Sequence, residues 1–236
     1  MKRILIALGV FVVLGVILNA AFNYSKSRDS QLFGELVHRV DTSQPVIALT
    51  FDDGPTPENT GVLLESLAQE NARATFFLMG RDVVANPEAA RAIMDAGHEI
   101  GNHSWDHPRM VAMTPRVVRS QLSRTDDAIR ALGYTGPLHF RPPYGRKLVV
   151  LPWVLDQQDR TTIMWSIEPE TTLGFEALAQ DLAAHVIETA QAGDIVLLHG
   201  MYSTNQSTRE ALPLILNGLR NRGFEFVTVS ELLALR

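Results

Sequence analysis

Residues 46–55 read VIALTFDDGP. The first six, Val46–Phe51, are mostly apolar or β-branched and predict a short strand that ends at a turn of two aspartates, a glycine and a proline. The adjacent carboxylates of Asp52 and Asp53 point in different directions, so one can bind a metal while its neighbour faces a reacting water. An Asx-type turn before Gly-Pro explains the same residues without any chemistry.

Strand-like and helical runs alternate over the rest of the chain. The predicted strands are Val46–Phe51, Ala74–Leu78, Glu99–Asn102, His139–Arg141, Thr161–Trp165, Ile195–His199 and Phe224–Val229. Helices are predicted over residues 60–70, 87–96, 115–132, 175–190, 208–222 and 231–235. This order favours an α/β protein whose parallel sheet forms a distorted or incomplete (β/α) barrel of seven or eight strands. A doubly wound open sheet is the alternative.

Polar side chains gather just after the predicted strand ends. They are Asp52/Asp53, His103/His107, Arg141–Gly145, Glu168/Glu170 and His199. In both architectures the carboxyl edge of the sheet is where a site is built, so this coincidence is the main argument for an enzyme.

His103 and His107 lie four residues apart in HSWDH. This spacing predicts that both imidazoles lie on one face of a helical turn, as two metal ligands require. Surface histidines also occur at this spacing. With an aspartate from another strand end, the set suits Zn²⁺, with Mn, Fe, Co or Ni as alternatives, and it leaves positions open for water and substrate.

Arg141 and His199 each have a chemical and a structural interpretation. Arg141 begins RPPYG, where its guanidinium can hold a carboxylate and the turn can present a backbone N–H to an oxyanion. A plain Pro-Pro turn is the alternative. His199 ends the apolar run IVLLH and is either a satisfied core histidine or a proton donor.

The amino terminus carries a cationic start, Lys2 and Arg3, followed by nineteen uncharged residues, Ile4–Phe22. At about 1.5 Å per residue this helix is long enough for the hydrocarbon core of about 30 Å. We therefore expect residues 1–31 to be a transmembrane anchor or signal helix with a polar linker, and residues 32–236 to be the catalytic domain. The expected location is the extracytoplasmic side of the cytoplasmic membrane, in the periplasm or cell wall. Secretion after cleavage is the alternative.

Composition excludes several classes of function. The 236 residues contain 21 basic and 26 acidic side chains, a formal charge of −5, so no electrostatic footprint for nucleic acid exists. Cysteine is absent, which excludes disulfides, thiolate metal sites and a cysteine nucleophile.

Four motifs occur in order: TFDDGP, HSWDHP, RPPYG and LLH. Together they resemble those of the polysaccharide deacetylase family, also described as carbohydrate esterase family 4 or the NodB-homology domain, over roughly residues 43–232. The resemblance implies a distorted (β/α) barrel and hydrolytic removal of N-acetyl groups from an amino-sugar polysaccharide, oligosaccharide or lipid-linked sugar. It also implies a divalent metal, most often Zn²⁺.

Carried over by motif, the family's metal ligands would be Asp53, His103 and His107. Asp52 would be the general base, held by Arg141. The remaining roles would be an oxyanion-stabilising backbone N–H at Tyr144 and a general acid at His199.

One segment departs from the family pattern D-x-x-D-W. By register Glu168 replaces the first aspartate, which normally orients the catalytic histidine, and Thr171-Thr172 replace Asp-Trp. We expect Glu168 to make the same hydrogen bond from one methylene further out. The change also motivates a second hypothesis, a metal-binding carbohydrate-binding protein with little activity. A phosphatase is the third, although its usual Asp-x-Asp spacing is absent. Trp105 and Tyr144 are candidates for stacking on the sugar.

Overall fold

The computed structural model describes the backbone of residues 2–236 and the side chains of residue 6 and residues 9–236. Its central strand is β2 (Val46–Asp52), and every residue of this strand is buried. Strand β2 pairs in parallel with β3 (Thr75–Leu78), β6 (Ile195–Leu198) and β7 (Glu225–Val227). Strand β3 pairs in parallel with β4 (Glu99–Asn102).

Further pairings extend the row of strands from β4 round towards β6, so that the strands form a ring. Phe140 forms single parallel bridges to Asn102 and to Thr162, and Ile167 forms one to Val196. Strand β5 (Thr162–Ile163) also pairs with β1 (Leu36–Val37). The predicted strand over residues 139–141 is therefore reduced to a bridge at Phe140. The prediction of an α/β fold with parallel strands is confirmed, and the ring is distorted because single bridges replace longer ladders.

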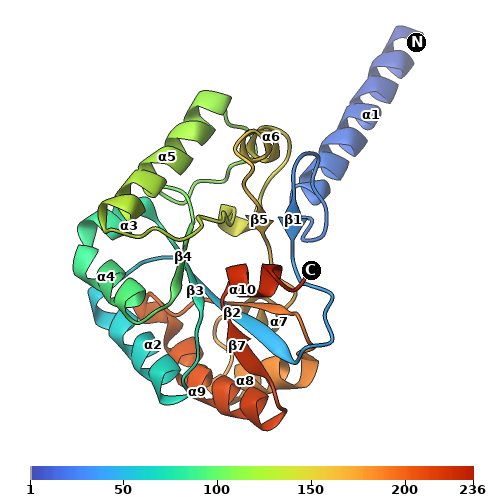
Figure 1. The fold of residues 1–236 in the computed structure, drawn as a ribbon. Coiled ribbons are helices and arrows are strands. Elements are labelled where there is room, and N and C mark those ends of the chain that lie inside the picture. The colour runs from blue at the N-terminus through green and yellow to red at the C-terminus, as the bar shows by residue number, and fades with distance from the viewer. Residues whose placement is uncertain (1) are drawn as a thin grey trace.

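Helices surround the strands (Figure 1). They are α2 (Pro57–Gln69), α3 (Gly80–Ala85), α4 (Pro87–Asp95), α5 (Pro115–Ala131), α6 (Val150–Asp156), α7 (Pro169–Leu173), α8 (Ala179–Thr189), α9 (Gln206–Asn221) and α10 (Val229–Leu233). Two short 3₁₀ turns, η1 (Pro143–Gly145) and η2 (Ser203–Asn205), complete the set. The sequence predicts the longer helices within a few residues and does not predict the short helices α3, α6 and α7.

Side chains alternate between the two faces of β2, and this alternation decides which of them reach the site. Ile47, Leu49 and Phe51 belong to the large apolar cluster that contains residues of α2, α8 and α9. Ala48 instead belongs to a second cluster, which includes residues of β5 and α10. Successive side chains of a strand point to opposite faces, so Asp52 lies on the same face as Ala48, away from the large cluster.

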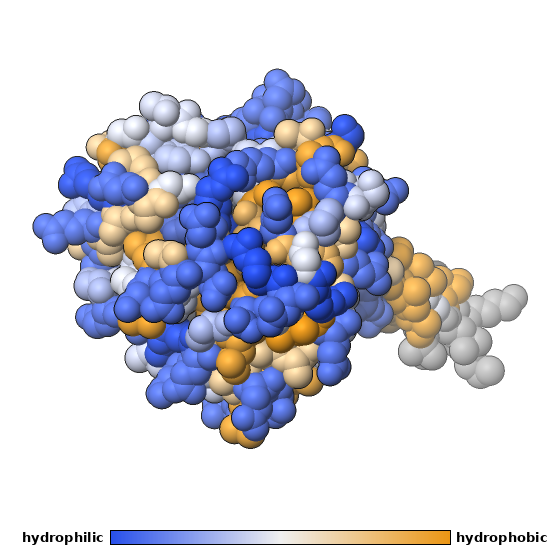
Figure 2. Space-filling model, turned by 60° about the horizontal axis from the view of Figure 1, so that its bottom comes forward, coloured by the Kyte–Doolittle hydropathy of each residue, from blue (hydrophilic) through white to orange (hydrophobic). Residues whose placement is uncertain are grey.

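Helix α1 (Lys2–Tyr24) projects away from the rest of the protein (Figure 1). Apolar side chains such as Phe11 and Leu18 are exposed along it, and Figure 2 shows this part of the helix in orange beside a mostly blue surface. Among the described residues, no helix meets the length and apolar character needed to cross a membrane. The segment after α1, predicted to be a polar linker, packs on the rest of the protein: Ser25 is buried, and Lys147 N–H donates to its carbonyl oxygen at 3.0 Å.

Candidate metal and catalytic site

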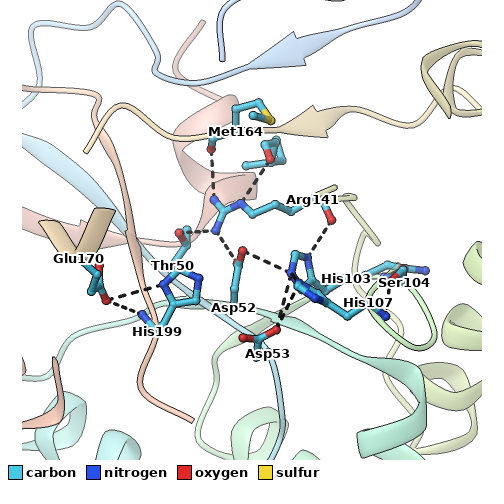
Figure 3. A network of polar contacts seen from close by, with 12 residues as sticks. Thr50, Asp52, Asp53, His103, Ser104, His107, Arg141, Met164, Glu170 and His199 are labelled. Atoms are coloured by element: carbon cyan, nitrogen blue, oxygen red, sulfur yellow. Dashed lines mark hydrogen bonds and ion pairs between the residues drawn. The ribbon is translucent and has the colours of Figure 1, made fainter. Parts of the chain in front are cut away.

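A cleft of about 710 Å³ opens where the parallel strands end. Most of the predicted site residues line it: Asp52, Asp53, His103, His107, Tyr144, Glu168 and His199. Figure 3 shows the two aspartates between the pair His103/His107 on one side and His199 on the other. The ends of β2, β4 and β6 supply these groups, as expected for an edge where parallel strands end together.

Asp53, His103 and His107 form a cluster with the composition of a metal site. One ligand atom from each lies within 4.8 Å of the others. The two histidine Nε2 atoms are 3.1 Å apart, and the Asp53 Oδ1 atom lies 3.9 Å from His103 Nε2 and 3.6 Å from His107 Nε2. Two nitrogens bound to one tetrahedral Zn²⁺ at about 2.0–2.1 Å are roughly 3.3 Å apart, so this arrangement fits the ion.

The protonation states also fit a cation. His103 Nδ1 lies 2.8 Å from the Arg141 carbonyl oxygen and donates to it, which leaves the Nε2 lone pair free for a metal. Burial, with the neighbouring His103, lowers the pKa of His107 to about 3. The imidazole of His107 is therefore neutral at pH 7, as a ligand must be. Burial also raises the pKa of Asp53, and a bound cation would relieve this penalty on its charged form.

The two histidines do not lie on a helical turn, so this part of the prediction is wrong. The backbone of Ser104 and His107 has positive φ angles of 67° and 60°. The turn is held by side-chain oxygens: Ser104 N–H donates to Asn102 Oδ1 at 2.8 Å, and His107 N–H donates to Ser104 Oγ at 3.1 Å. A bent loop thus brings together two imidazoles that the sequence spacing assigned to a helix.

Asp52 is held by a fully buried arginine. Arg141 Nη1 donates to Asp52 Oδ1 and to Thr50 Oγ1, both at 2.7 Å. The rest of the guanidinium donates to the carbonyl oxygens of Ile163 at 3.3 Å and Met164 at 3.2 Å. Burial opposes the charge on Asp52, but Arg141 outweighs it and holds the pKa of this carboxyl below its usual range. Asp52 is therefore ionised at neutral pH.

His199 is paired with Glu170 and not with Glu168, which corrects the prediction. Glu170 Oε1 accepts from His199 N–H at 2.8 Å and lies 3.8 Å from His199 Nδ1. His199 Nδ1 and Glu170 Oε2 are both buried without a hydrogen-bond partner among the described residues. Burial disfavours the imidazolium, but Glu170, helped by Asp52 and Asp53, outweighs it and raises the pKa of His199 to about 9.

Glu168 faces a different part of the cleft. Its Oε2 atom accepts from Trp165 Nε1 at 2.9 Å and from Arg28 Nη2 at 2.6 Å. The reason lies in helix α7: Glu168 is its N-cap, and Pro169 begins the helix, so the chain turns before Glu170. The sequence contained a signal for Glu170, because this acidic residue lies in the same predicted cluster.

Tyr144 and Trp105 differ in their positions. Tyr144 lies in η1 at the cleft; the residue is 55% exposed, and its ring centroid lies 4.5 Å from that of His107. Trp105 is not among the residues that line the cleft. Its ring packs beneath the Arg124 guanidinium, 3.8 Å from the ring centroid, and the backbone N–H of Trp105 donates to Gln121 Oε1 on α5 at 2.9 Å. The left-handed turn at Ser104 directs Trp105 towards α5 and away from the residues that line the cleft.

Backbone strain concentrates in this region. Six non-glycine residues of the described chain have positive φ angles, and four of them are Asp53, Ser104, His107 and Tyr144. Such conformations cost of order 1–3 kcal/mol each and persist where the surroundings impose them, typically at functional sites.

Comparison with known proteins agrees with this geometry. The polysaccharide deacetylase family profile matches residues 39–162, which is more than half of the chain. A peptidoglycan-N-acetylglucosamine deacetylase of Bacillus cereus is 34% identical over 200 residues, covering 85% of this chain and 93% of the relative. This chain belongs to the polysaccharide deacetylase family.

Longer relatives and solved structures extend the comparison. The Bacillus subtilis peptidoglycan-N-acetylmuramic acid deacetylase PdaC is 34% identical, and the match covers 82% of this chain but only 40% of that protein. The Bc1960 peptidoglycan N-acetylglucosamine deacetylase structure matches with a TM-score of 0.78 and 30% identity, over 84% of this chain and 92% of that one.

The family also includes proteins described as inactive. The structure of BA3943, a family 4 pseudoenzyme from Bacillus anthracis, matches with a TM-score of 0.74 and 29% identity, over 86% of this chain and 70% of that one. Membership in the polysaccharide deacetylase family therefore does not decide whether a given chain is active. Activity depends on the residues that line the cleft.

The Arg141–Asp52 ion pair predicts a pH-dependent loss of stability. Removing one partner of a buried pair costs about 3–5 kcal/mol, so we expect Arg141→Met to lower the free energy of unfolding by that amount at pH 7. The pKa of Asp52 is depressed in the folded state, so its contribution is present above its unfolded pKa and is lost as pH falls. The difference between wild type and variant should therefore hold down to about pH 4 and shrink below it, as measured by urea denaturation at pH 7 and at about pH 3.

The matched control is Arg116→Met, which removes an exposed arginine of α5. We expect it to change the free energy of unfolding by less than about 0.5 kcal/mol at either pH. A similarly small effect for Arg141→Met would show that Asp52 does not depend on this partner.

Proposed function

We propose that this chain is a metal-dependent hydrolase that removes N-acetyl groups from an amino-sugar glycan, with peptidoglycan N-acetylglucosamine as the first candidate. The observation that carries the proposal is the position of the ionised Asp52. It lies between His199, which is protonated at neutral pH, and the three side chains that could hold one metal ion, and all of these residues line one cleft (Figure 3). The B. cereus relative named for this activity supports the substrate class, because this chain covers 93% of its length.

Asp53, His103 and His107 would hold the metal, with Zn²⁺ as the leading candidate and Co²⁺, Ni²⁺ or Mn²⁺ as alternatives. When bound, the ion would polarise the acetyl carbonyl and make water more acidic. Asp52 faces the same space, since its Oδ2 atom lies 3.6 Å from His103 Nε2. It would accept a proton from the attacking water, and Arg141 would keep it ionised and fixed in orientation.

His199 would donate a proton to the sugar nitrogen as the amide C–N bond breaks, so the products are a free amine and acetate. Its raised pKa keeps it protonated at neutral pH, and Glu170 acts as its positioning residue. The backbone N–H of Tyr144 would donate to the oxyanion. One such preorganised donor is typically worth about 2.7–4 kcal/mol.

The alternative of a carbohydrate-binding protein without activity rested on the altered segment at Glu168. Glu170 supplies the carboxylate beside His199, so the loss of aspartate at position 168 does not leave the histidine without a partner. Pure binding would need neither an ionised Asp52 nor a protonated His199. We therefore favour the enzyme.

Asp52→Asn tests the function directly. We expect it to lower the rate of acetate release from N-acetylglucosamine oligomers or peptidoglycan by about 10²–10⁴-fold, the usual contribution of a general base. Acetate and free amine are followed by mass spectrometry on the full chain loaded with Zn²⁺ or Co²⁺. The variant should keep one metal ion per chain, whereas His107→Ala should lose it. An Asp52→Asn variant that keeps most of the wild-type rate would refute the assignment.

The pair Glu170→Gln and Glu168→Gln separates the two carboxylates. A raised pKa means that His199 keeps its proton below about pH 9 and loses it above, so the wild-type rate should fall on that alkaline side. Removing the Glu170 charge should lower the pH at which the rate falls by about one pH unit or more. Glu168→Gln should leave the pH of this alkaline fall in rate unchanged. The pH profile of kcat/KM measures both, and equal shifts would contradict the pairing.

For localisation we propose that residues 2–24 attach the catalytic part to the extracytoplasmic face of the membrane. The support is the cationic start at Lys2 and Arg3 before the uncharged run, and the exposed apolar side chains of α1. We expect the full chain to sediment with membranes after an alkaline carbonate wash. Recovery of a shortened protein in the medium would favour cleavage and secretion instead.

A further inference from the structure

Residues 25–28 form part of one wall of the catalytic cleft. Ser25 is buried, and its carbonyl oxygen accepts from Lys147 N–H at 3.0 Å. Lys147 is buried as well, and its Nζ atom donates to the Ser27 carbonyl oxygen. Arg146 Nη1 donates to Ser25 Oγ at 3.0 Å. Arg146 and Lys147, which directly follow RPPYG, thus bind Ser25 and Ser27 and hold this segment beside the site.

Arg28 anchors this segment from the other end. Its Nη2 atom is 2.6 Å from Glu168 Oε2, and its guanidinium lies over the Trp165 ring, 4.9 Å from the ring centroid. Trp165 Nε1 donates to the same Glu168 oxygen, which holds the carboxylate in place. The position assigned by family register to an orienting aspartate is therefore occupied by a glutamate that fastens the amino-terminal segment.

This fastening places two cationic side chains together at the cleft. Lys26 and Arg146 both line it. The Lys26 Nζ atom is 4.6 Å and the Arg146 guanidinium carbon 4.2 Å from the centroid of the same Phe22 ring. Within the described part of the chain, neither has a carboxylate oxygen within 4.0 Å.

Two cations beside one aromatic ring repel each other, and an anion bound near both would offset this repulsion. Arg146 Nη1 also donates to the Phe22 carbonyl oxygen at 3.3 Å, but a neutral carbonyl does not cancel the guanidinium charge. Both cations at the cleft therefore lack an acidic partner among the described residues, which indicates a role in binding. An arginine beside a lysine suits the oxygens of a carboxylate or phosphate group.

We propose that Lys26 and Arg146 bind an anionic group of the glycan, a carboxylate or a phosphate, next to the sugar that loses its acetyl group. Arg28 is the positioning residue that holds Lys26 in the wall. The inference rests on the proposed function, because it places the anion relative to the deacetylated sugar. It makes the segment after α1 a determinant of specificity.

Binding is measured by calorimetry on the full chain carrying Asp52→Asn and loaded with Zn²⁺, so that turnover does not interfere. The three probes are neutral N-acetylglucosamine tetramer, a tetramer that alternates N-acetylglucosamine with muramic acid bearing free carboxylates, and N-acetylglucosamine linked to a short prenyl diphosphate. The second and third probes separate the carboxylate from the phosphate as the source of the anion.

We expect Lys26→Ala with Arg146→Ala to raise the Kd of at least one anionic probe about tenfold, and of the neutral tetramer less than twofold. Arg28→Ala should act in the same direction, and Arg116→Ala, at an exposed position of α5, should change nothing. Raising the salt concentration should remove the preference for the anion. Equal changes for neutral and anionic probes, or no change for either anionic probe, would overturn the proposal.

Wild-type turnover of the same three probes is followed in parallel. Absence of acetate release from all of them would count against the proposed function alone, because the Kd comparison does not depend on turnover.

Discussion

The ion pair between Arg141 and Asp52 is the contact on which the rest of the site depends. Arg141 is fully buried, and its guanidinium joins Asp52 and Thr50 of β2 to the carbonyl oxygens of Ile163 and Met164 on the opposite side of the ring. Its own carbonyl oxygen accepts from His103. One residue therefore keeps Asp52, the proposed base, ionised and sets the tautomer of His103, a proposed metal ligand. An unpaired buried charge would destabilise the fold by several kcal/mol, so site and fold are coupled.

Parallel strands supply the second constraint, because they deliver their carboxyl ends to one edge. Asp52 ends the completely buried β2 and Asp53 follows it, His103 follows β4, and His199 follows β6. The bridges of Phe140 to Asn102 and Thr162 then place Arg141 directly across from them. The strained backbone of Asp53, His107 and Tyr144 completes the arrangement, since it directs side chains into the cleft that a relaxed turn would direct elsewhere.

The parts that the sequence predicts well are those set by local pattern. The buried runs of β2, β4 and β6 and the capped helix α5 follow from apolar spacing, from Gly and Pro, and from Thr114, whose side chain accepts from Val117 N–H. The clustering of Asp53, His103 and His107 follows from motif order and strand ends. These features depend on residues close in sequence or on the general rule that parallel strands end together.

The parts that the sequence misses depend on geometry that no nearby residue signals. Glu168 and Glu170 are two residues apart, and the start of α7 at Pro169 decides which one reaches His199. Trp105 turns away because Ser104, a residue with no glycine signal, adopts a left-handed conformation. The contact of Arg28 with Glu168 joins residues 140 positions apart, so the packing of the predicted linker into the cleft had no local signature.

The most direct test of a complete metal site is anomalous X-ray diffraction at the zinc edge from crystals of the Zn²⁺-loaded protein. The account predicts one strong peak within about 2.0–2.2 Å of Nε2 of His103, Nε2 of His107 and a carboxylate oxygen of Asp53. In the same map Asp52 should stay on Arg141 and outside the coordination shell. A peak that is absent, or one bound through His199 and Glu170, would contradict it.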